Sequence, residues 1–114
     1  IVDAYNANPS SMAAAIENFR LMQVKDKMAI LGDMRELGAA SGEEHQKVVD
    51  LLKNTGIDNV WLVGEEVGKT RTSFRKFHDV EEVKAEIARR RPENHYILIK
   101  GSNGIKLFDL PALL

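Results

Sequence analysis

Two carboxylates, Asp33 and Glu36, are the residues of this sequence whose type and spacing point most directly to chemistry. They follow the apolar run 28–31, and a glycine stands on each side of the pair. A carboxylate in such a loop could hold an ammonium group through charge-assisted hydrogen bonds. The alternative is local: Asp33 binds the N–H groups of its own loop, and Glu36 pairs with Arg35 or solvent. Two carboxylates without further ligands do not define a metal site, so we predict none.

A second polar group, Lys100, Ser102 and Asn103, follows the apolar run 96–99. Lys100 could hold a carboxylate or a phosphate, and the hydroxyl and amide could bind the same group. Gly101 would let the backbone come close to a ligand. The alternative is an ordinary Gly-Ser-Asn turn with a solvated lysine.

Asp3 leads a third polar segment, which begins as the strand-like residues 1–3 end. A carboxylate there can accept hydrogen bonds from two ribose hydroxyls, as acidic residues do in other nucleotide-binding folds. The simpler interpretation of the residues alone is that Asp3 caps the turn or the helix that follows, because local capping needs no ligand.

All three groups need strands that end at a common edge of a sheet. Short apolar runs between turn signals are typical of buried parallel strands, and alternation of apolar and polar residues is typical of an edge strand. The runs are 1–3, 27–31, 59–63 and 96–99, and residues 73–77 alternate. Ligands of open α/β sheets lie beyond the carboxyl ends of the strands. We therefore expect the ends of 1–3, 27–31 and 96–99 to meet.

Helical periodicity separates these strands. An apolar face at i, i+4 and i+7 predicts a helix to about Met22, with Pro9 in its first turn and Asn8 or Ser10 as its cap. Ser41 and Glu44 have capping-box spacing before a second helix, which ends near Gly56 and turns His45 inward. Asp79 and Glu82 repeat the spacing before a third helix, and residues 65–71 suggest a short helix or turn. Strands alternating with helices predict a three-layer, Rossmann-like α/β fold: an open, mostly parallel sheet with helices on both faces.

Composition indicates one domain, residues 1–114, with enough chain for a real core. The net charge of −1 gives no basic field for nucleic acid, and no apolar run is long enough to span a membrane. The chain has no cysteine, which suits a cytosolic protein. Because Ile1 has the character of a strand interior and no methionine precedes it, we expect a domain of a longer protein.

Three segments resemble a known family in order and spacing: DAYNANP at 3–9, LGDMRELG at 31–38 and IKGS at 99–102. The first two are specific in combination, whereas KGS alone is weak. Together they resemble the C-terminal domain of a Mur ligase, nearest to the type that adds D-alanyl-D-alanine to UDP-N-acetylmuramoyl-tripeptide in peptidoglycan precursor synthesis.

The resemblance implies a three-domain enzyme of the bacterial cytoplasm. In such enzymes ATP phosphorylates a carboxylate, and an amine attacks the acyl phosphate. An N-terminal domain holds the UDP-sugar peptide. A central domain carries the P-loop and supplies most of the ligands of Mg²⁺. This chain has no G-x-x-x-x-G-K-[ST] motif, so it would be the closing domain and inactive alone.

The resemblance also assigns roles to individual residues. It implies that the DAYNANP segment faces ATP, with Asp3 and Asn6 as contacts and Tyr5 either contacting or only packing. The residues implied to bind D-alanyl-D-alanine are Asp33, Glu36, Lys100, Ser102 and Asn103. Asn103 departs from the family, whose members often have arginine there. No catalytic residue is assigned to this domain.

Two other functions fit a chain of this length. A receiver-type signalling domain would need a phosphoacceptor aspartate at the end of its third strand, but that strand runs into Gly64-Glu65. A non-enzymatic small-molecule or protein-binding module needs no P-loop. A P-loop encoded upstream of Ile1 would favour the ligase, and a natural start at Ile1 would favour the binding module.

Overall fold

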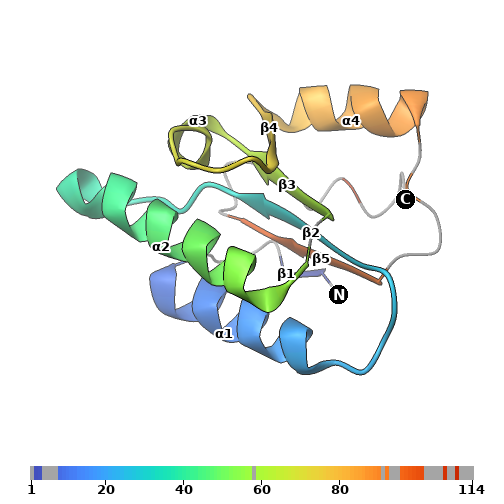
Figure 1. The fold of residues 1–114 in the computed structure, drawn as a ribbon. Coiled ribbons are helices and arrows are strands. Elements are labelled where there is room, and N and C mark those ends of the chain that lie inside the picture. Colours follow the sequence, from blue (N-terminus) through green and yellow to red (C-terminus); the bar gives the residue numbers. More distant parts are fainter. Residues whose placement is uncertain are drawn as a thin grey trace.

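The computed structural model of the chain has a five-stranded parallel sheet between two layers of helices (Figure 1). The structure describes residues 8–57, 59–90, 92, 96–101, 107 and 110, and the backbone of residues 2–3. The strands are β1 (Val2–Asp3), β2 (Lys27–Gly32), β3 (Asn59–Val63), β4 (Arg75–Phe77) and β5 (Tyr96–Lys100). The helices are α1 (Pro9–Leu21), a 3₁₀ turn (Gly38–Ala40), α2 (Ser41–Thr55), α3 (Glu65–Gly68) and α4 (Val80–Arg89). The predicted three-layer α/β fold is confirmed.

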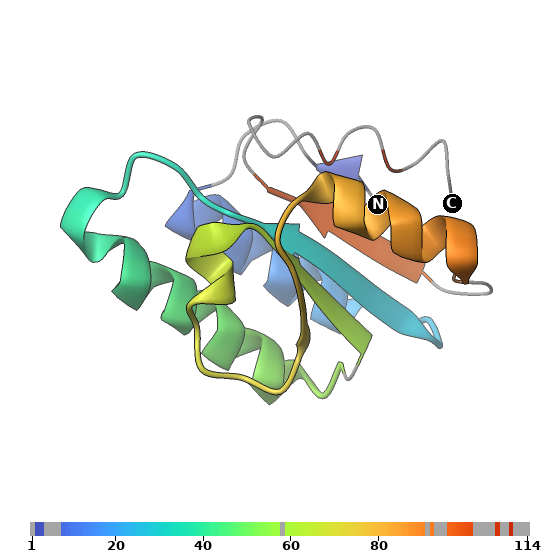
Figure 2. The same ribbon diagram turned by 90° about the horizontal axis from the view of Figure 1, so that it is seen from above.

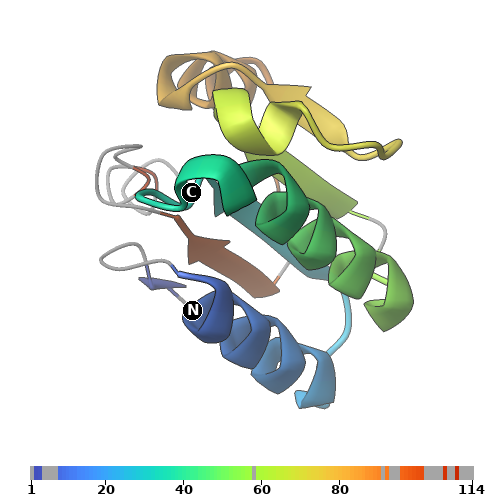
Figure 3. The same ribbon diagram turned by 90° about the vertical axis from the view of Figure 1, so that its left-hand side faces the viewer.

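The two faces of the sheet carry separate cores because side chains alternate along each strand. On β2, Ala29 and Leu31 pack with α1 and α2, whereas Met28 and Ile30 pack with α4. Figures 2 and 3 show α1 and α2 side by side on one face and α4 on the other. Trp61 is 5% exposed and packs against Phe77 on the α4 face.

The strand order β1-β5-β2-β3-β4 explains which helices share a face. The chain moves in one direction across the sheet from β1 to β2 and on to β3, and it returns from β4 to β5. Right-handed crossovers then put α1 and α2 on one face and α4 on the other. The receiver-type fold is excluded, because β1 is here an edge strand rather than an interior one.

The strand order also creates a topological switch point at β5. After β1 and β2 the chain passes to the face of α1 and α2. After β5 it reaches Leu107 and Leu110, which pack in the core on the α4 face. Connections leaving neighbouring strands toward opposite faces open a crevice at the carboxyl edge, and this is where open α/β sheets bind ligands.

The helix boundaries confirm most of the predicted signals. Asn8 caps α1 by accepting a hydrogen bond from the Ser11 N–H, with Pro9 in the first turn. Asp79 caps α4 in the same way through the Glu82 N–H. Gly56 ends α2 in the left-handed conformation, at a φ of 79°, which glycine adopts without strain.

The predicted capping box at Ser41 and Glu44 is wrong. A 3₁₀ turn runs directly into α2, so Ser41 is already helical, and Ala40 occupies the cap position with no side-chain hydrogen bond. The Ser41 hydroxyl instead donates to the Glu66 carboxylate at 2.7 Å. Glu44 forms an ion pair with Lys47 within α2.

Candidate functional site

The three strand ends that carry the predicted site residues lie next to one another. Asp3 at the end of β1 is in register with Lys100 at the end of β5. Lys100 is in register with Leu31 on β2, two residues before Asp33. Because all three strands are parallel, their polar ends share the carboxyl edge at the switch point. The predicted convergence of these strands is confirmed.

Asp33 is 9% exposed, and its carboxylate binds another element rather than its own loop. One oxygen accepts from the Val67 N–H at 2.8 Å, and the other accepts from the Glu66 N–H at 3.2 Å. Asp33 therefore satisfies two of the free N–H groups in the first turn of α3. The alternative in which Asp33 binds the N–H groups of its own loop is wrong, because the partners come from beyond β3.

Gly64 explains how Asp33 comes so close to α3. A Cβ atom built on Gly64 would lie 2.4 Å from the Asp33 Cγ atom, and the residue has a φ of +126°. Only glycine supplies both the missing side chain and the backbone conformation. Gly64, directly after β3, thus leaves the space that the Asp33 carboxylate occupies.

Glu36 differs from Asp33 although it lies in the same loop. It is exposed and has a φ of 60°, in the left-handed region that is uncommon for residues other than glycine. Gly38 has a similar φ of 56°. Two left-handed residues turn the loop sharply, and the Glu36 carboxylate faces outward.

Lys100 is not a solvated lysine, because it is only 1% exposed. Its side chain belongs to the same face of β5 as Leu98, which is the face of α1 and α2. Gly101 has a role within the chain: a Cβ there would lie 2.7 Å from Leu107 Cδ1 and 3.0 Å from Gly32 Cα. This close packing within the chain favours a glycine at position 101.

Other predicted contacts lie outside the described residues. These are Tyr5, Asn6, Ser102 and Asn103, and of Asp3 only the backbone is described. Their assignment to nucleotide or dipeptide remains a prediction.

His45 is a residue of this region whose role the sequence did not reveal. It is 1% exposed. Its Nε2 accepts a hydrogen bond at 2.9 Å from the N–H of Met34, which is the residue directly after Asp33. Its Nδ1 lies 2.7 Å from the Ser41 carbonyl oxygen. A histidine on the inward face of a helix needs polar partners, which was the available signal. The identity of the partner was not readable, because it depends on the path of the loop.

Glu66 extends this set of contacts to α3. The Lys69 ammonium, and after it the Ser41 hydroxyl, hold the pKa of the Glu66 carboxyl below its ordinary value. The Lys69 ion pair measures 2.9 Å. Glu66 is therefore a carboxylate at neutral pH and accepts from Ser41 in its charged form.

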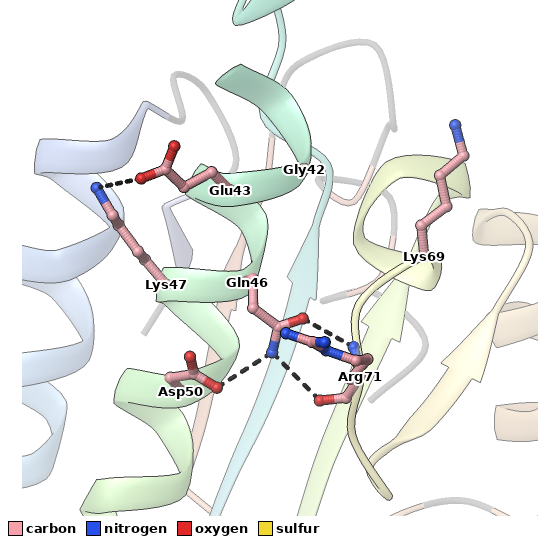
Figure 4. A pocket seen from close by; sticks show the side chains of 7 residues that line it. All are labelled: Gly42, Glu43, Gln46, Lys47, Asp50, Lys69 and Arg71. Atoms are coloured by element: carbon pink, nitrogen blue, oxygen red, sulfur yellow. Dashed lines mark hydrogen bonds and ion pairs between the residues drawn. The ribbon is translucent and has the colours of Figure 1, made fainter. Parts of the chain in front are cut away.

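A hollow of about 470 Å³ lies between α2 and the segment after α3 (Figure 4). The Gln46 amide bridges it by accepting from the Arg71 N–H at 2.9 Å and donating to the Arg71 carbonyl at 3.2 Å. Lys47 and Glu43 form an ion pair at its rim. Of the predicted site residues whose side chains the structure describes, none lines this hollow.

The described part of the chain contains neither a cluster of three metal-binding side chains nor a helix that could span a membrane. No three His, Asp or Glu side chains there gather closely enough to hold a cation. Among the same residues, no helix has the length and apolar character needed to cross a bilayer.

Comparison with known proteins identifies relatives that share this domain. The ligase named UDP-N-acetylmuramoyl-tripeptide–D-alanyl-D-alanine ligase from Rickettsia prowazekii is 36% identical over 113 residues, covering 94% of this chain and 25% of the relative. The Bacillus subtilis protein of the same name is 32% identical over 120 residues, covering 96% of this chain and 26% of the relative. The chain thus spans about a quarter of the curated relatives it matches.

Solved structures and a family model agree with these relatives. A crystal structure of MurF from Acinetobacter baumannii superimposes with a TM-score of 0.75 at 30% identity, covering 96% of this chain and 26% of that one. The family model described as "Mur ligase, glutamate ligase domain" matches residues 1–103. That range includes β1 to β5 and every predicted site residue. The chain therefore belongs to the Mur ligase family, as its glutamate ligase domain.

Proposed function

We propose that this chain is the C-terminal domain of a cytoplasmic, ATP-dependent ligase that adds D-alanyl-D-alanine to UDP-N-acetylmuramoyl-tripeptide in bacterial cell-wall synthesis. In this reaction the γ-phosphoryl group of ATP passes to a substrate carboxylate, giving an acyl phosphate and ADP. The dipeptide amine then attacks the acyl carbon, and phosphate leaves. The N-terminal and central domains of the same protein would hold the UDP-sugar peptide, the P-loop and Mg²⁺.

One observation carries the proposal: the ends of β1, β5 and β2 meet at a topological switch point, in a chain of this family. Asp3, Lys100 and Leu31 lie in register across these strands. These strand ends share the edge at which open α/β sheets bind ligands, and this supports assigning the polar residues of the three segments to a site there. The names of the relatives support the choice of D-alanyl-D-alanine as the amino substrate.

The end of β1 is the proposed nucleotide side of this edge. Asp3 would accept hydrogen bonds from the ribose hydroxyls, Asn6 would add a second contact, and Tyr5 would contact the nucleotide or pack beside it. These assignments rest on the DAYNANP segment and on the position of β1 beside β5.

The end of β2 is the proposed amino-substrate side. Asp33 is bonded to α3, but a carboxylate has more lone pairs than the two hydrogen bonds use, so an ammonium could still bind there. Glu36 offers an exposed carboxylate a few residues further on. Either carboxylate could orient the dipeptide amine for attack through charge-assisted hydrogen bonds.

The end of β5 would supply the positive charge. Lys100 would bind the carboxylate of the dipeptide or a phosphate, and Ser102 and Asn103 would bind the same group. Because Lys100 is 1% exposed, its ammonium would have to exchange a contact within the chain for the ligand. A cation held at a strand end in this way is preorganised for an anionic group.

A substrate-omission assay on the full-length enzyme tests the proposed function. ADP release should require ATP, UDP-N-acetylmuramoyl-tripeptide and D-alanyl-D-alanine together. The 114-residue chain alone should release no ADP, because it has no P-loop. Turnover by the isolated chain, or dipeptide-independent turnover by the full enzyme, would contradict the proposal.

The variant Glu36→Gln tests the proposed dipeptide contact with little risk to folding, because Glu36 is exposed. Removing one charge from an ammonium contact should raise the KM for D-alanyl-D-alanine about tenfold. The KM for ATP should not change. Glu81→Gln on α4 is the matched control, since Glu81 is also exposed but pairs with Lys84 within its own helix.

A further inference from the structure

His45 connects the β2–α2 loop to the body of the domain. Its ring is buried on the inner face of α2, and Nε2 accepts the N–H of Met34 at 2.9 Å. Met34 follows Asp33, and its own side chain is 2% exposed. The imidazole therefore holds the loop at the residue between the Asp33 carboxylate and the turn that carries Glu36.

The contacts of His45 define its tautomer. A backbone N–H can only donate, so Nε2 must be the unprotonated nitrogen. The proton is then on Nδ1, where it donates to the Ser41 carbonyl oxygen at 2.7 Å. The neutral Nδ1–H imidazole is the form that satisfies both partners.

His45 is also one member of a closed ring of hydrogen bonds. The Ser41 hydroxyl donates to Glu66, and the N–H of Glu66 donates to the Asp33 carboxylate. The peptide bond from Asp33 to Met34 and the Met34–His45 hydrogen bond continue the ring. The hydrogen bond from His45 Nδ1 to the Ser41 carbonyl oxygen closes it. The ring ties the loop to α2 and α3 at once, so the position of Asp33 depends on both helices.

The rest of the loop has little regular structure to hold it. Residues 33–37 lie between β2 and the 3₁₀ turn, and Glu36 and Gly38 are left-handed. Without the His45 acceptor, the Met34 N–H would have to find another partner, and the loop would shift to provide one. Such a shift would move Asp33 and Glu36 relative to the strand ends.

We propose that His45 is a positioning residue for the amino substrate: through the Met34 N–H it sets the geometry of the two loop carboxylates. This inference rests on the proposed function, in which that loop binds D-alanyl-D-alanine. His45 itself would touch neither substrate nor nucleotide. Its loss should affect the dipeptide selectively, because the nucleotide side of the edge is formed by another strand.

Two amide substitutions in the full-length enzyme separate the contacts of His45. In His45→Gln the amide oxygen can reach the position of Nε2 and accept the Met34 N–H. In His45→Asn the shorter amide reaches only the position of Nδ1, so the Ser41 contact is kept and the Met34 contact is lost. His78→Asn is the matched control, since His78 is exposed at the end of the edge strand β4.

His45→Asn should raise the KM for D-alanyl-D-alanine about tenfold or more, because small displacements of a positioning loop cost this much. His45→Gln should stay within about threefold of the wild type, since it keeps the acceptor. The KM for ATP should change by less than about twofold in both variants. Ser41→Ala, which opens the ring but leaves the Met34 contact, should raise only the dipeptide KM, by about threefold.

An unchanged dipeptide KM in His45→Asn would overturn the inference. Equal increases in the KM for ATP and dipeptide would also overturn it, because they would indicate general loosening of the domain. If His45→Asn does not fold, the inference depends on Ser41→Ala, and an unchanged dipeptide KM there would overturn it. A wild-type enzyme that ignores the dipeptide would refute the proposed function itself, which is a different result.

Discussion

The two ends of the β2–α2 loop contrast in burial and in hydrogen bonding. Asp33 is 9% exposed and joined to α3 by two hydrogen bonds, and it is seated on a glycine that admits no side chain. Glu36, three residues later, is exposed and left-handed. The sequence segment GDMRELG therefore combines a carboxylate that is held by hydrogen bonds inside the domain with one that is exposed to solvent.

This contrast separates stability from binding within one loop. A residue whose hydrogen bonds are made inside the domain should affect folding when it is changed. Replacing a residue in a strained, exposed conformation should leave the free energy of unfolding nearly unchanged or raise it, so such a residue can be tested for binding separately. The predictions below test the two ends of the loop against each other.

Gly64→Ala should have the largest effect, because the new methyl group would meet the Asp33 carboxylate and the backbone φ is +126°. We expect a loss of about 3 kcal/mol in the free energy of unfolding, measured by urea denaturation of the 114-residue chain. Gly42→Ala is the matched control, since a Cβ atom there would meet no described atom within 4 Å apart from the neighbouring residues and backbone of its own helix. It should stabilise α2 by about 0.5–1 kcal/mol. Equal effects of the two substitutions would contradict the close packing of the Asp33 carboxylate against Gly64.

Asp33→Ala should destabilise the chain by about 2 kcal/mol, because it leaves two N–H groups of α3 without their acceptor. Asp33→Asn keeps one acceptor oxygen and should lose about half as much. The same denaturation measurement applies. If the urea midpoint of Asp33→Ala equals that of the wild type, Asp33 has no structural role, and the comparison with Glu36 fails.

Glu36→Gly should stabilise the chain by about 0.5–1 kcal/mol, since glycine adopts a φ of 60° without strain. In the full-length enzyme the same change should raise the KM for D-alanyl-D-alanine. Opposite changes in stability and binding would sharpen the contrast with Asp33. A Glu36→Gly variant that is less stable and binds the dipeptide normally would reverse the roles assigned to the two ends.

The smallest effect concerns pH and the link between Ser41 and Glu66. Lys69, followed by Ser41, lowers the pKa of Glu66 below its ordinary 4.5 in the folded chain. A lowered carboxyl pKa contributes stability that is present above the ordinary value and lost as the pH falls through the folded value. Ser41→Ala should therefore be less stable than the wild type at neutral pH, and the difference should shrink in acid. A difference that is the same at both pH values would contradict this link.

The strand ends were predictable because each apolar run stops at a glycine or a charged residue, and the sheet then brings parallel ends together. The partner of Asp33 was not predictable from local sequence. The register of Gly32 with Val63 puts Asp33 beside Gly64 and the start of α3, more than 30 residues away in the chain. Such a contact is a property of the sheet and leaves no signal in either segment alone.

Ser41 shows the opposite failure, in which a local pattern was present and misleading. The spacing to Glu44 fits a capping box, but the 3₁₀ turn at Gly38–Ala40 continues directly into α2, so Ser41 is already helical and is not the cap residue. The hydroxyl was then available for Glu66. His45 was correctly expected on the inner face of α2, whereas its bond to Met34 followed only from the path of the loop.

A structure of the full-length enzyme with an ATP analogue and D-alanyl-D-alanine bound tests the account most directly. We predict that the nucleotide contacts the end of β1 and that the dipeptide lies over the ends of β5 and β2, near Glu36 and Lys100. Ligands bound at the opposite edge, beside Lys27 and Tyr96 where β2 and β5 begin, would contradict the account.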